Sequence, residues 1–200
     1  MADTPAPDAS AADSIWSGRN VLVAVTGGIA CYKSATLVSR LIQAGAAVRV
    51  IMTEAATRFI GPLTFQSLTG RPVLTSIWQV DDQPESQHIG LARWAHLVIV
   101  APATANAIAK FAHGLCDDIV SLTLAAVPQG TPVLLAPAMN SDMWANPAIQ
   151  RNIQTVRDLL GYHMVGPEEG WQACRTKGLG RMSEPEAILK AAEAVVGPAR

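Results

Sequence analysis

The chain has 200 residues and half of them are hydrophobic, which suits one α/β domain with a substantial core. Its 15 basic and 16 acidic residues give a net charge of −1 and form no long runs, so no electrostatic surface for nucleic acid or an anionic membrane is indicated. We therefore expect a small-molecule ligand.

The amino-terminal segment and the cysteines indicate the cellular compartment of the protein. Residues 1–18 are rich in Ala, Asp, Ser and Pro and predict a disordered leader, not a signal or transit peptide, before a domain over 19–197. No apolar stretch reaches the roughly 18 residues that a membrane span needs. Cys31, Cys116 and Cys174 stand at unrelated spacings and predict neither disulfides nor a metal site. These features favour a cytoplasmic protein.

The domain begins with a strand, a glycine turn and a helix. The apolar run 20–25 predicts a buried strand, Gly27 and Gly28 follow it, and a helical pattern spans 32–44. Glycines let the backbone approach an anion, and the start of a helix attracts phosphate. The spacing matches neither the dinucleotide nor the nucleoside-triphosphate fingerprint, so a plain tight turn is an equally good interpretation.

The next part carries two candidate polar residues. Its predicted elements are a strand at 47–52, a short helix at 60–70, an edge strand at 72–78 and a polar loop at 79–87. Thr53 follows the first of these strands, where it can cap a helix or meet a phosphate. His88 follows the loop at the start of a helical pattern, and is a candidate base, a cap or a surface residue.

The second half repeats the alternation of strand and helix. It contains predicted strands at 96–100, 131–135 and 162–165 and predicted helices at 107–112, 119–126, 148–160 and 185–196. Residues 166–182 predict a long structureless loop, and Ser183 with Glu186 forms a capping-box pattern for the last helix. The alternation predicts an α/β fold, a doubly wound parallel sheet in three layers.

Small or polar turns follow four of these strands. They hold Thr26, Thr53, residues 101–106 and residues 137–140, and they share the sheet edge where open α/β sheets bind ligands. Asn140 in the last turn has an amide that can both donate and accept, which suits a carboxylate or a flavin edge. Asn is also a common turn residue, so a purely structural interpretation remains open.

The turn segments, taken in order, resemble those of the phosphopantothenoylcysteine decarboxylases, a family of homo-oligomeric flavin-containing cysteine decarboxylases. The matching segments are 26–33, 52–56, 88–89, 101–106, the Pro-x-Met-Asn-x-x-Met-Trp octet 137–144, 173–174 and 178–182. The resemblance covers about residues 20–196. It implies a flavodoxin-like fold and FMN-dependent decarboxylation of 4′-phosphopantothenoylcysteine to 4′-phosphopantetheine in coenzyme A biosynthesis.

The same resemblance assigns roles to residues. It implies that FMN is bound by Gly27, Gly28, Ile29, Thr53, Thr104, Ala105, Asn106 and Ala138. His88 would be the catalytic base, Asn140 would orient the substrate carboxylate, and Cys174 would donate the last proton. The substrate would contact Asn140, Met143, Ala173, Arg175, Lys177 and Arg181. These roles suit a cofactor that supplies the electron sink while the protein supplies proton transfer and orientation.

Two residues depart from the family pattern. Cys31 replaces a usual alanine in the first loop, a small change that should not expel FMN. Arg175 stands where the family has a glycine, which bears on the backbone of the loop that carries Cys174. The basic residues of that loop either meet the substrate phosphate or form a solvated surface. The family also implies a trimer or a larger assembly of trimers with shared sites, and many bacterial relatives continue into a ligase domain.

Two other functions compete with this interpretation. The peptidyl-cysteine decarboxylases share the His and the octet, but they usually lack the cysteine that Cys174 matches. A flavin-binding regulatory subunit shares the fold but carries long acidic or low-complexity extensions.

Overall fold

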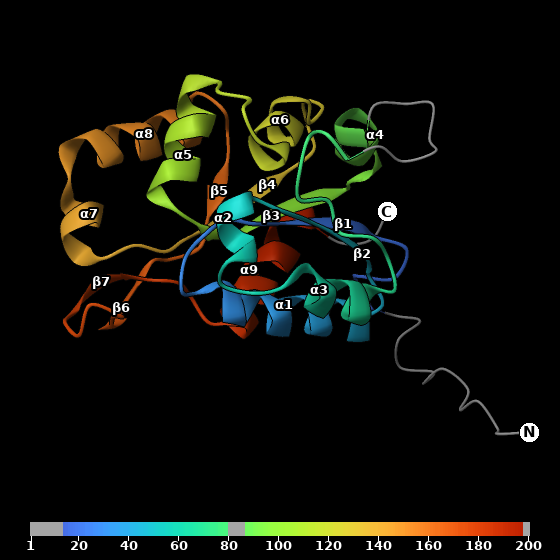
Figure 1. Cartoon of the computed structure of the whole chain (residues 1–200), viewed down its shortest axis with the longest axis horizontal. Coiled ribbons are helices and arrows are strands. Elements are labelled where there is room, and N and C mark those ends of the chain that lie inside the picture. Colours follow the sequence, from blue (N-terminus) through green and yellow to red (C-terminus); the bar gives the residue numbers. More distant parts are fainter. Residues whose placement is uncertain (1–13, 80–86, 198–200) are drawn as a thin grey trace, which may run out of the picture.

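The structure is a computed structural model that describes residues 14–79 and 87–197. Within this described part, five parallel strands form the central sheet in the order β2-β1-β3-β4-β5 (Figure 1). They are β1 (Asn20–Val25), β2 (Ala47–Met52), β3 (Leu97–Ala103), β4 (Val133–Pro137) and β5 (His163–Met164). This order is that of flavodoxin-like sheets, which bind ligands where the topology switches between β1 and β3. The predicted fold class is confirmed.

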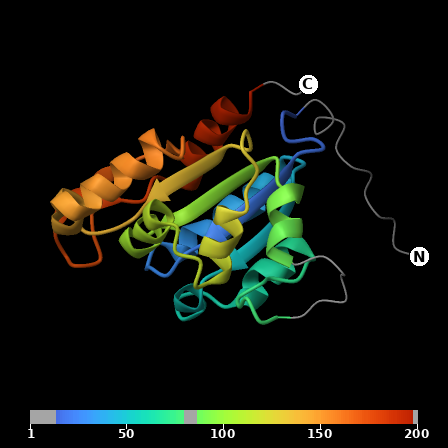
Figure 2. The same cartoon turned by 90° about the horizontal axis from the view of Figure 1, so that it is seen from above.

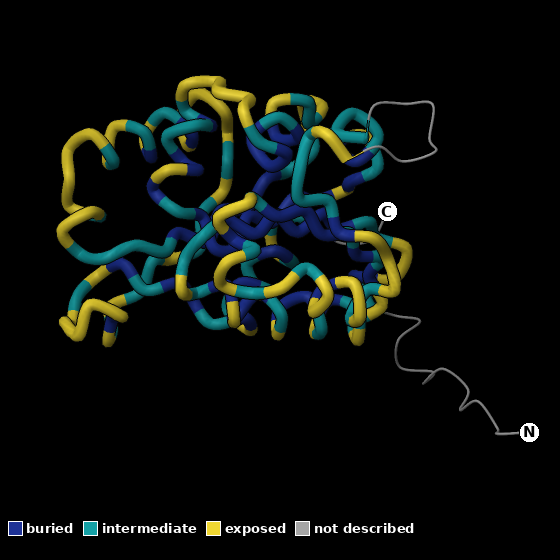
Figure 3. The backbone as a smooth tube through the Cα atoms, in the orientation of Figure 1, coloured by how far each residue is buried: buried dark blue, intermediate teal, exposed yellow. Residues whose placement is uncertain are grey.

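Helices cover both faces of the sheet (Figures 1 and 2). One face carries α1 (Cys31–Gln43), α3 (Pro62–Thr69) and α9 (Pro185–Val196); the other carries α4 (Gln87–Trp94), α5 (Ala105–His113), α6 (Ile119–Ala125) and α8 (Pro147–Asp158). Side chains of β1 alternate between two cores, with Val23 in one and Leu22 in the other. Figure 3 shows the buried sheet between the two partly exposed layers.

Four short elements stand beyond the carboxyl ends of the strands. They are α2 (Glu54–Thr57), α7 (Ser141–Ala145), β6 (Glu168–Trp171) and β7 (Lys177–Arg181). The last two form an antiparallel hairpin, so the prediction of a structureless loop over 166–182 is wrong. The hairpin is stabilised by contacts with a distant segment, because the Met139 N–H donates to the Gly180 carbonyl oxygen at 2.9 Å. A sequence pattern does not reveal such a contact.

Three smaller predictions are also corrected. Residues 72–78 form no strand, and only Leu74 makes an isolated bridge to Ile51. The capping box of Ser183 and Glu186 does not form, since α9 begins after Glu184 with Pro185 in its first turn. Proline needs no hydrogen-bond partner at that position. β3 runs three residues past the predicted end at Val100, up to Ala103.

The amino-terminal end of the described chain packs on the core. Trp16 is only 1% exposed, and its indole Nε1 donates to Glu193 Oε1 at 3.1 Å. Residues 14–18 therefore belong with the domain, in contrast to the predicted leader, whose residues 1–13 lie outside the described part. Across the described residues, every helix is too short or too polar to traverse a bilayer.

Candidate functional site

A cavity of about 1250 Å³ opens at the carboxyl ends of the strands. This volume exceeds the ~300–1000 Å³ typical of a site for one small ligand. Most of the predicted site residues line it: Gly27, Gly28, Ile29, Thr53, Thr104, Ala105, Asn106, Ala138, Asn140, Met143, Ala173, Cys174 and Arg181. His88, Arg175 and Lys177 do not. The sheet edge therefore gathers the predicted turns into one site.

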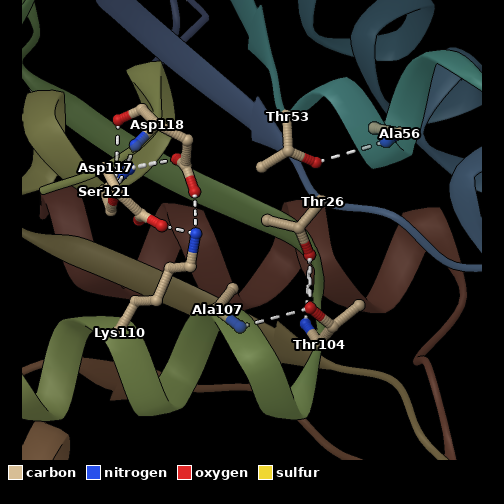
Figure 4. Close-up of polar contacts among 9 residues, drawn as sticks. All are labelled: Thr26, Thr53, Ala56, Thr104, Ala107, Lys110, Asp117, Asp118 and Ser121. Carbon is tan, nitrogen blue, oxygen red and sulfur yellow. Dashed lines mark hydrogen bonds and ion pairs between the residues drawn. The ribbon is translucent and has the colours of Figure 1, made fainter. Parts of the chain in front are cut away.

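Among the helices that begin at this cavity, α1, α2 and α5 differ in how their first turns are capped. Thr53 caps α2 by accepting from the Ala56 N–H at 3.2 Å, and Thr104 caps α5 by accepting from the Ala107 N–H at 3.3 Å (Figure 4). Helix α1 begins after Ala30 without a side-chain cap. Of these three helices, α1 therefore has the positive end best suited to receive an anion from the cavity.

A threonine bridge holds the turns after β1 and β3 together. Thr26 is 1% exposed, and its Oγ1 donates to the Pro102 carbonyl oxygen at 2.6 Å. The same Oγ1 accepts from the Thr104 N–H at 3.1 Å (Figure 4). Both turns belong to the topological switch point, where the strands' connections diverge. The bridge thus fixes the floor of the cavity without using any charged group.

A charge cluster at the cavity wall was missed by the sequence analysis. Lys110 Nζ lies 2.6 Å from both Asp117 Oδ1 and Asp118 Oδ2 (Figure 4). Burial alone would lower the pKa of Lys110, but the two carboxylates raise it overall. Asp118 also caps α6 by accepting from the Ser121 N–H at 2.8 Å, as its position before that helix predicts. Lys110 and Asp118 are eight residues apart and belong to different helices, so no sequence pattern predicts that they form an ion pair.

Asn140 has its oxygen already engaged. Its Oδ1 accepts from the Met143 N–H at 2.8 Å and caps the short helix α7. The structural role that sequence alone left open is therefore real. The Nδ2 group can donate to a ligand without disturbing this cap, and a donor suits a carboxylate.

Cys174 lies in the exposed turn that joins β6 to β7. Its Sγ is 2.9 Å from Thr176 Oγ1 and 3.5 Å from Gln172 Oε1. The next residue, Arg175, has a φ of 65°, in the left-handed region that glycine adopts without strain. The turn therefore keeps a glycine-type backbone despite the arginine. Gln172 was not among the predicted site residues, although it lies next to Ala173 and Cys174.

Ion pairs and a hydrogen bond connect the base of the hairpin to α1. Lys33 Nζ donates to Glu184 Oε1 at 3.0 Å and to the Met182 carbonyl oxygen at 2.9 Å, and Arg181 pairs with the same carboxylate. Hydrogen bonding from Lys33 holds the pKa of Glu184 below its ordinary value. The strand that leaves the cavity is thus fastened to the helix that begins there.

His88 is separated from the other predicted catalytic residues. It lies half-buried in the first turn of α4, at the opposite end of the molecule from α7 and the hairpin (Figures 1 and 2). One chain brings Asn140 and Cys174 to the same cavity, but it does not bring His88 there.

Comparison with known proteins gives consistent matches. The Flavoprotein family model matches residues 10–197. The coenzyme A biosynthesis bifunctional protein CoaBC of Bacillus subtilis is 50% identical over 177 residues, which are 88% of this chain and 43% of that protein. The chain therefore spans less than half the length of this curated relative.

Solved structures match over almost their full lengths. PPC decarboxylase, solved as a cysteine-to-serine mutant complexed with pantothenoylaminoethenethiol, is 31% identical with a TM-score of 0.78, and the match covers 88% of this chain and 97% of that one. The FMN binding protein AtHal3 is 30% identical with a TM-score of 0.75, covering 88% of this chain and 95% of that one.

Proposed function

The chain belongs to the Flavoprotein family, and from this premise we propose that it is an FMN-dependent phosphopantothenoylcysteine decarboxylase, a carbon–carbon lyase of coenzyme A biosynthesis. The observation that carries the proposal is the hairpin that brings Cys174 to the same cavity as Asn140. A carboxylate-binding amide and a proton-donating thiol are the two groups that this reaction requires beside its cofactor and base.

The cavity residues fit FMN. The uncapped start of α1, with Gly28 before it, offers one phosphate site. A Cβ on Gly28 would meet only the Thr104 Cγ2 at 3.5 Å, so the space there is open to a ligand. Bound FMN would supply reversible two-electron chemistry, which the protein side chains lack. The lining by Ala105, Ala138 and the Thr104 methyl suits the flat ring.

The remaining roles follow from the positions of the side chains. Asn140 Nδ2 would donate to the substrate carboxylate and so orient the bond that breaks. The substrate loses two electrons and two protons, exchanges its carboxylate for a proton as carbon dioxide leaves, and regains two electrons and two protons. The Cys174 thiol would deliver the proton that returns to carbon. Arg175 and Lys177, exposed beside it, would face the substrate phosphate from outside the cavity.

His88 would reach the cavity of a neighbouring protomer in a homotrimer or an assembly of trimers. Support comes from the separation, within one chain, of α4, which carries His88, from α7 and the β6–β7 hairpin (Figure 1). Large apolar side chains at the cavity are also exposed: Ile29 by 61%, Tyr32 by 63% and Trp171 by 67%. Coverage by a second copy would bury this rim and supply the base.

A ligase partner fits the same pathway. The matched relatives are bifunctional and more than twice the length of the matched region. We expect a ligase activity, on the same or another chain, to supply the substrate.

The test is the mass of the product formed from 4′-phosphopantothenoylcysteine by the purified protein. We expect one carbon dioxide per substrate and fully reduced 4′-phosphopantetheine, with FMN released on denaturation. A product two hydrogens lighter would instead indicate the purely oxidative chemistry of the peptidyl-cysteine decarboxylases. Flavin binding without any turnover would favour a regulatory role.

A further inference from the structure

The turn that carries Cys174 is exposed except for one side chain. Gln172 is 7% exposed, whereas Trp171 before it is 67% exposed. The Gln172 Oε1 accepts from the Ser141 N–H at 3.1 Å, and its Nε2 donates to the Gly178 carbonyl oxygen at 3.1 Å. One partner only donates and the other only accepts, so a single orientation of the amide satisfies both. A buried amide is costly unless it is bonded in this way.

Gln172 contacts both segments that carry proposed active-site residues, the start of α7 beside Asn140 and the turn with Cys174. Ser141, which it holds, follows Asn140 directly and begins α7. The same Oε1 is the hydrogen-bond partner of the Cys174 thiol at 3.5 Å. The Gln172 backbone also closes the turn, because its N–H donates to the Thr176 carbonyl oxygen at 2.9 Å. The amide of Gln172 therefore links the segment of Asn140, the proposed carboxylate ligand, to the Cys174 thiol.

Strand β7 has its own attachment to the octet, which does not use the Gln172 side chain. A Cβ on Gly180 would lie 2.2 Å from the Met139 carbonyl oxygen, and one on Gly178 would lie 2.8 Å from the Ser141 Cβ. Glycine allows this close approach, and a backbone hydrogen bond between Met139 and Gly180 secures it. Loss of the Gln172 amide should thus release the turn at 172–176 while β7 and Asn140 stay in place.

We propose that Gln172 is a positioning residue that sets the Cys174 thiol relative to Asn140, and that it acts in proton return rather than in oxidation and decarboxylation. The inference rests on the proposed function. Asn140 keeps its own cap at Met143, so carboxylate loss does not depend on the Gln172 amide. Proton transfer to carbon depends steeply on the position of the donor.

The test compares Gln172→Met with the wild type and with Gln150→Met. Methionine keeps the volume but makes none of the amide's hydrogen bonds. Gln150 is a matched control because its amide also donates to a backbone carbonyl, that of Trp144 within α7, and this hydrogen bond does not involve the hairpin. In anaerobic single turnovers of the FMN-loaded protein, we expect Gln172→Met to release carbon dioxide within about threefold of the wild-type rate and to slow the reduction step at least about tenfold, so that the oxidised enethiol and reduced flavin accumulate together. Gln150→Met should give fully reduced product.

A second readout needs no turnover. Arg175 is a trypsin site in the turn, and Lys177 is one at the start of β7 directly after it. A released turn should therefore be cut at these sites at least about tenfold faster in Gln172→Met than in wild type or Gln150→Met. Gln172→Glu should behave like Gln172→Met, because a carboxylate has no proton to donate to the Gly178 carbonyl.

The outcomes separate the two proposals. If wild type itself yields only the enethiol, the proposed function fails whatever the variants do. If wild type yields phosphopantetheine and Gln172→Met does the same at an equal rate with unchanged trypsin cleavage, the positioning role is wrong. Equal loss of both half-reactions and of bound flavin would also overturn it, since that pattern indicates a general structural role.

Discussion

Two adjacent glycines in the first turn have different surroundings. A Cβ on Gly27 would lie 2.5 Å from the Ala55 Cβ and 2.8 Å from the Ala55 carbonyl carbon, so this glycine is required for packing of α2. Gly28 has no such contact and faces the cavity. One glycine therefore serves the fold, and the other is placed to serve the ligand.

The pair gives a first prediction. Gly27→Ala should lower stability by roughly 1–3 kcal/mol through overpacking, seen as a fall of several degrees in the Tm of the apoprotein. Gly28→Ala should leave that Tm nearly unchanged but weaken FMN binding at least about tenfold, because the new methyl group enters the ligand's space. Flavin fluorescence titration measures the second effect. Equal Tm losses in both variants would contradict the division of roles.

Arg175 carries the second prediction. A non-glycine residue in the left-handed region costs roughly 1–2 kcal/mol, so Arg175→Gly should tighten the turn and slow trypsin cleavage at Lys177. Arg175→Ala is the control, because it removes the charge and keeps the backbone strain. Faster reduction of the substrate in Arg175→Gly than in Arg175→Ala would show that backbone strain limits the turn. If the two variants behave alike, only the charge matters.

At the level of elements, the hairpin base depends on one carboxylate. Glu184 pairs with Lys33 and Arg181, and hydrogen bonding from Lys33 lowers its pKa below the ordinary value of 4.5. The pairing therefore contributes stability above pH 4.5, and this stability is lost as pH falls through the lowered pKa. Glu184 is 46% exposed at its side chain, so solvent screening keeps the contribution to about 1 kcal/mol or less.

The third prediction uses this pH dependence. The Tm of Glu184→Gln should lie below that of wild type at about pH 6 and converge with it as the pH falls through the lowered pKa of Glu184, below which the wild-type carboxyl is also protonated. Glu186→Gln is the control, because its pair with Arg40 is longer, at 3.8 Å, and exposed on both sides. A difference between wild type and Glu184→Gln that persists unchanged at the lowest pH would show that the carboxylate charge is not responsible.

The sequence predicted those elements whose stabilisation is local or follows from burial. Strand β1 and its turn were predicted because an apolar run ends at glycines, and Asn140 was found because it follows β4 directly. The hairpin was missed because glycines at 178 and 180 are typical of loops until the octet lies against them. Gln172 was missed for the same reason, since its partners Ser141 and Gly178 become neighbours only in the folded chain.

At the scale of the whole molecule, the positions of His88 and Cys174 set a geometrical condition. They lie toward opposite ends of one chain, with α4 and the hairpin separated by the length of the sheet (Figure 2). If both serve one reaction, each site must combine residues of two protomers. A site shared between protomers can therefore be distinguished from a site within one protomer by testing whether His88 and Cys174 act from different protomers, whatever the symmetry of the assembly.

Subunit mixing tests it. His88→Asn alone should bind FMN but fail to oxidise the substrate, and Cys174→Ser alone should release carbon dioxide but leave the enethiol unreduced, since a hydroxyl gives up a proton far less readily than a thiol. Co-expressed under two affinity tags and purified through both, the variants form mixed oligomers. Where a Cys174→Ser protomer supplies His88 to the cavity of a His88→Asn protomer, both groups are intact. After selection through both tags, about one site in three is of this kind in a trimer, and about one in four in a large, randomly mixed assembly.

Mixed oligomers should therefore form phosphopantetheine at about a quarter to a third of the wild-type rate. Separately purified variants combined in the same tube give the control, because without subunit exchange they contain no repaired site and should form none. A site built within one chain would leave every protomer of the mixed oligomer defective in one group or the other. Absence of phosphopantetheine from the doubly purified oligomers, with flavin bound and carbon dioxide still released, would place His88 and Cys174 in the same protomer's site and refute the shared arrangement.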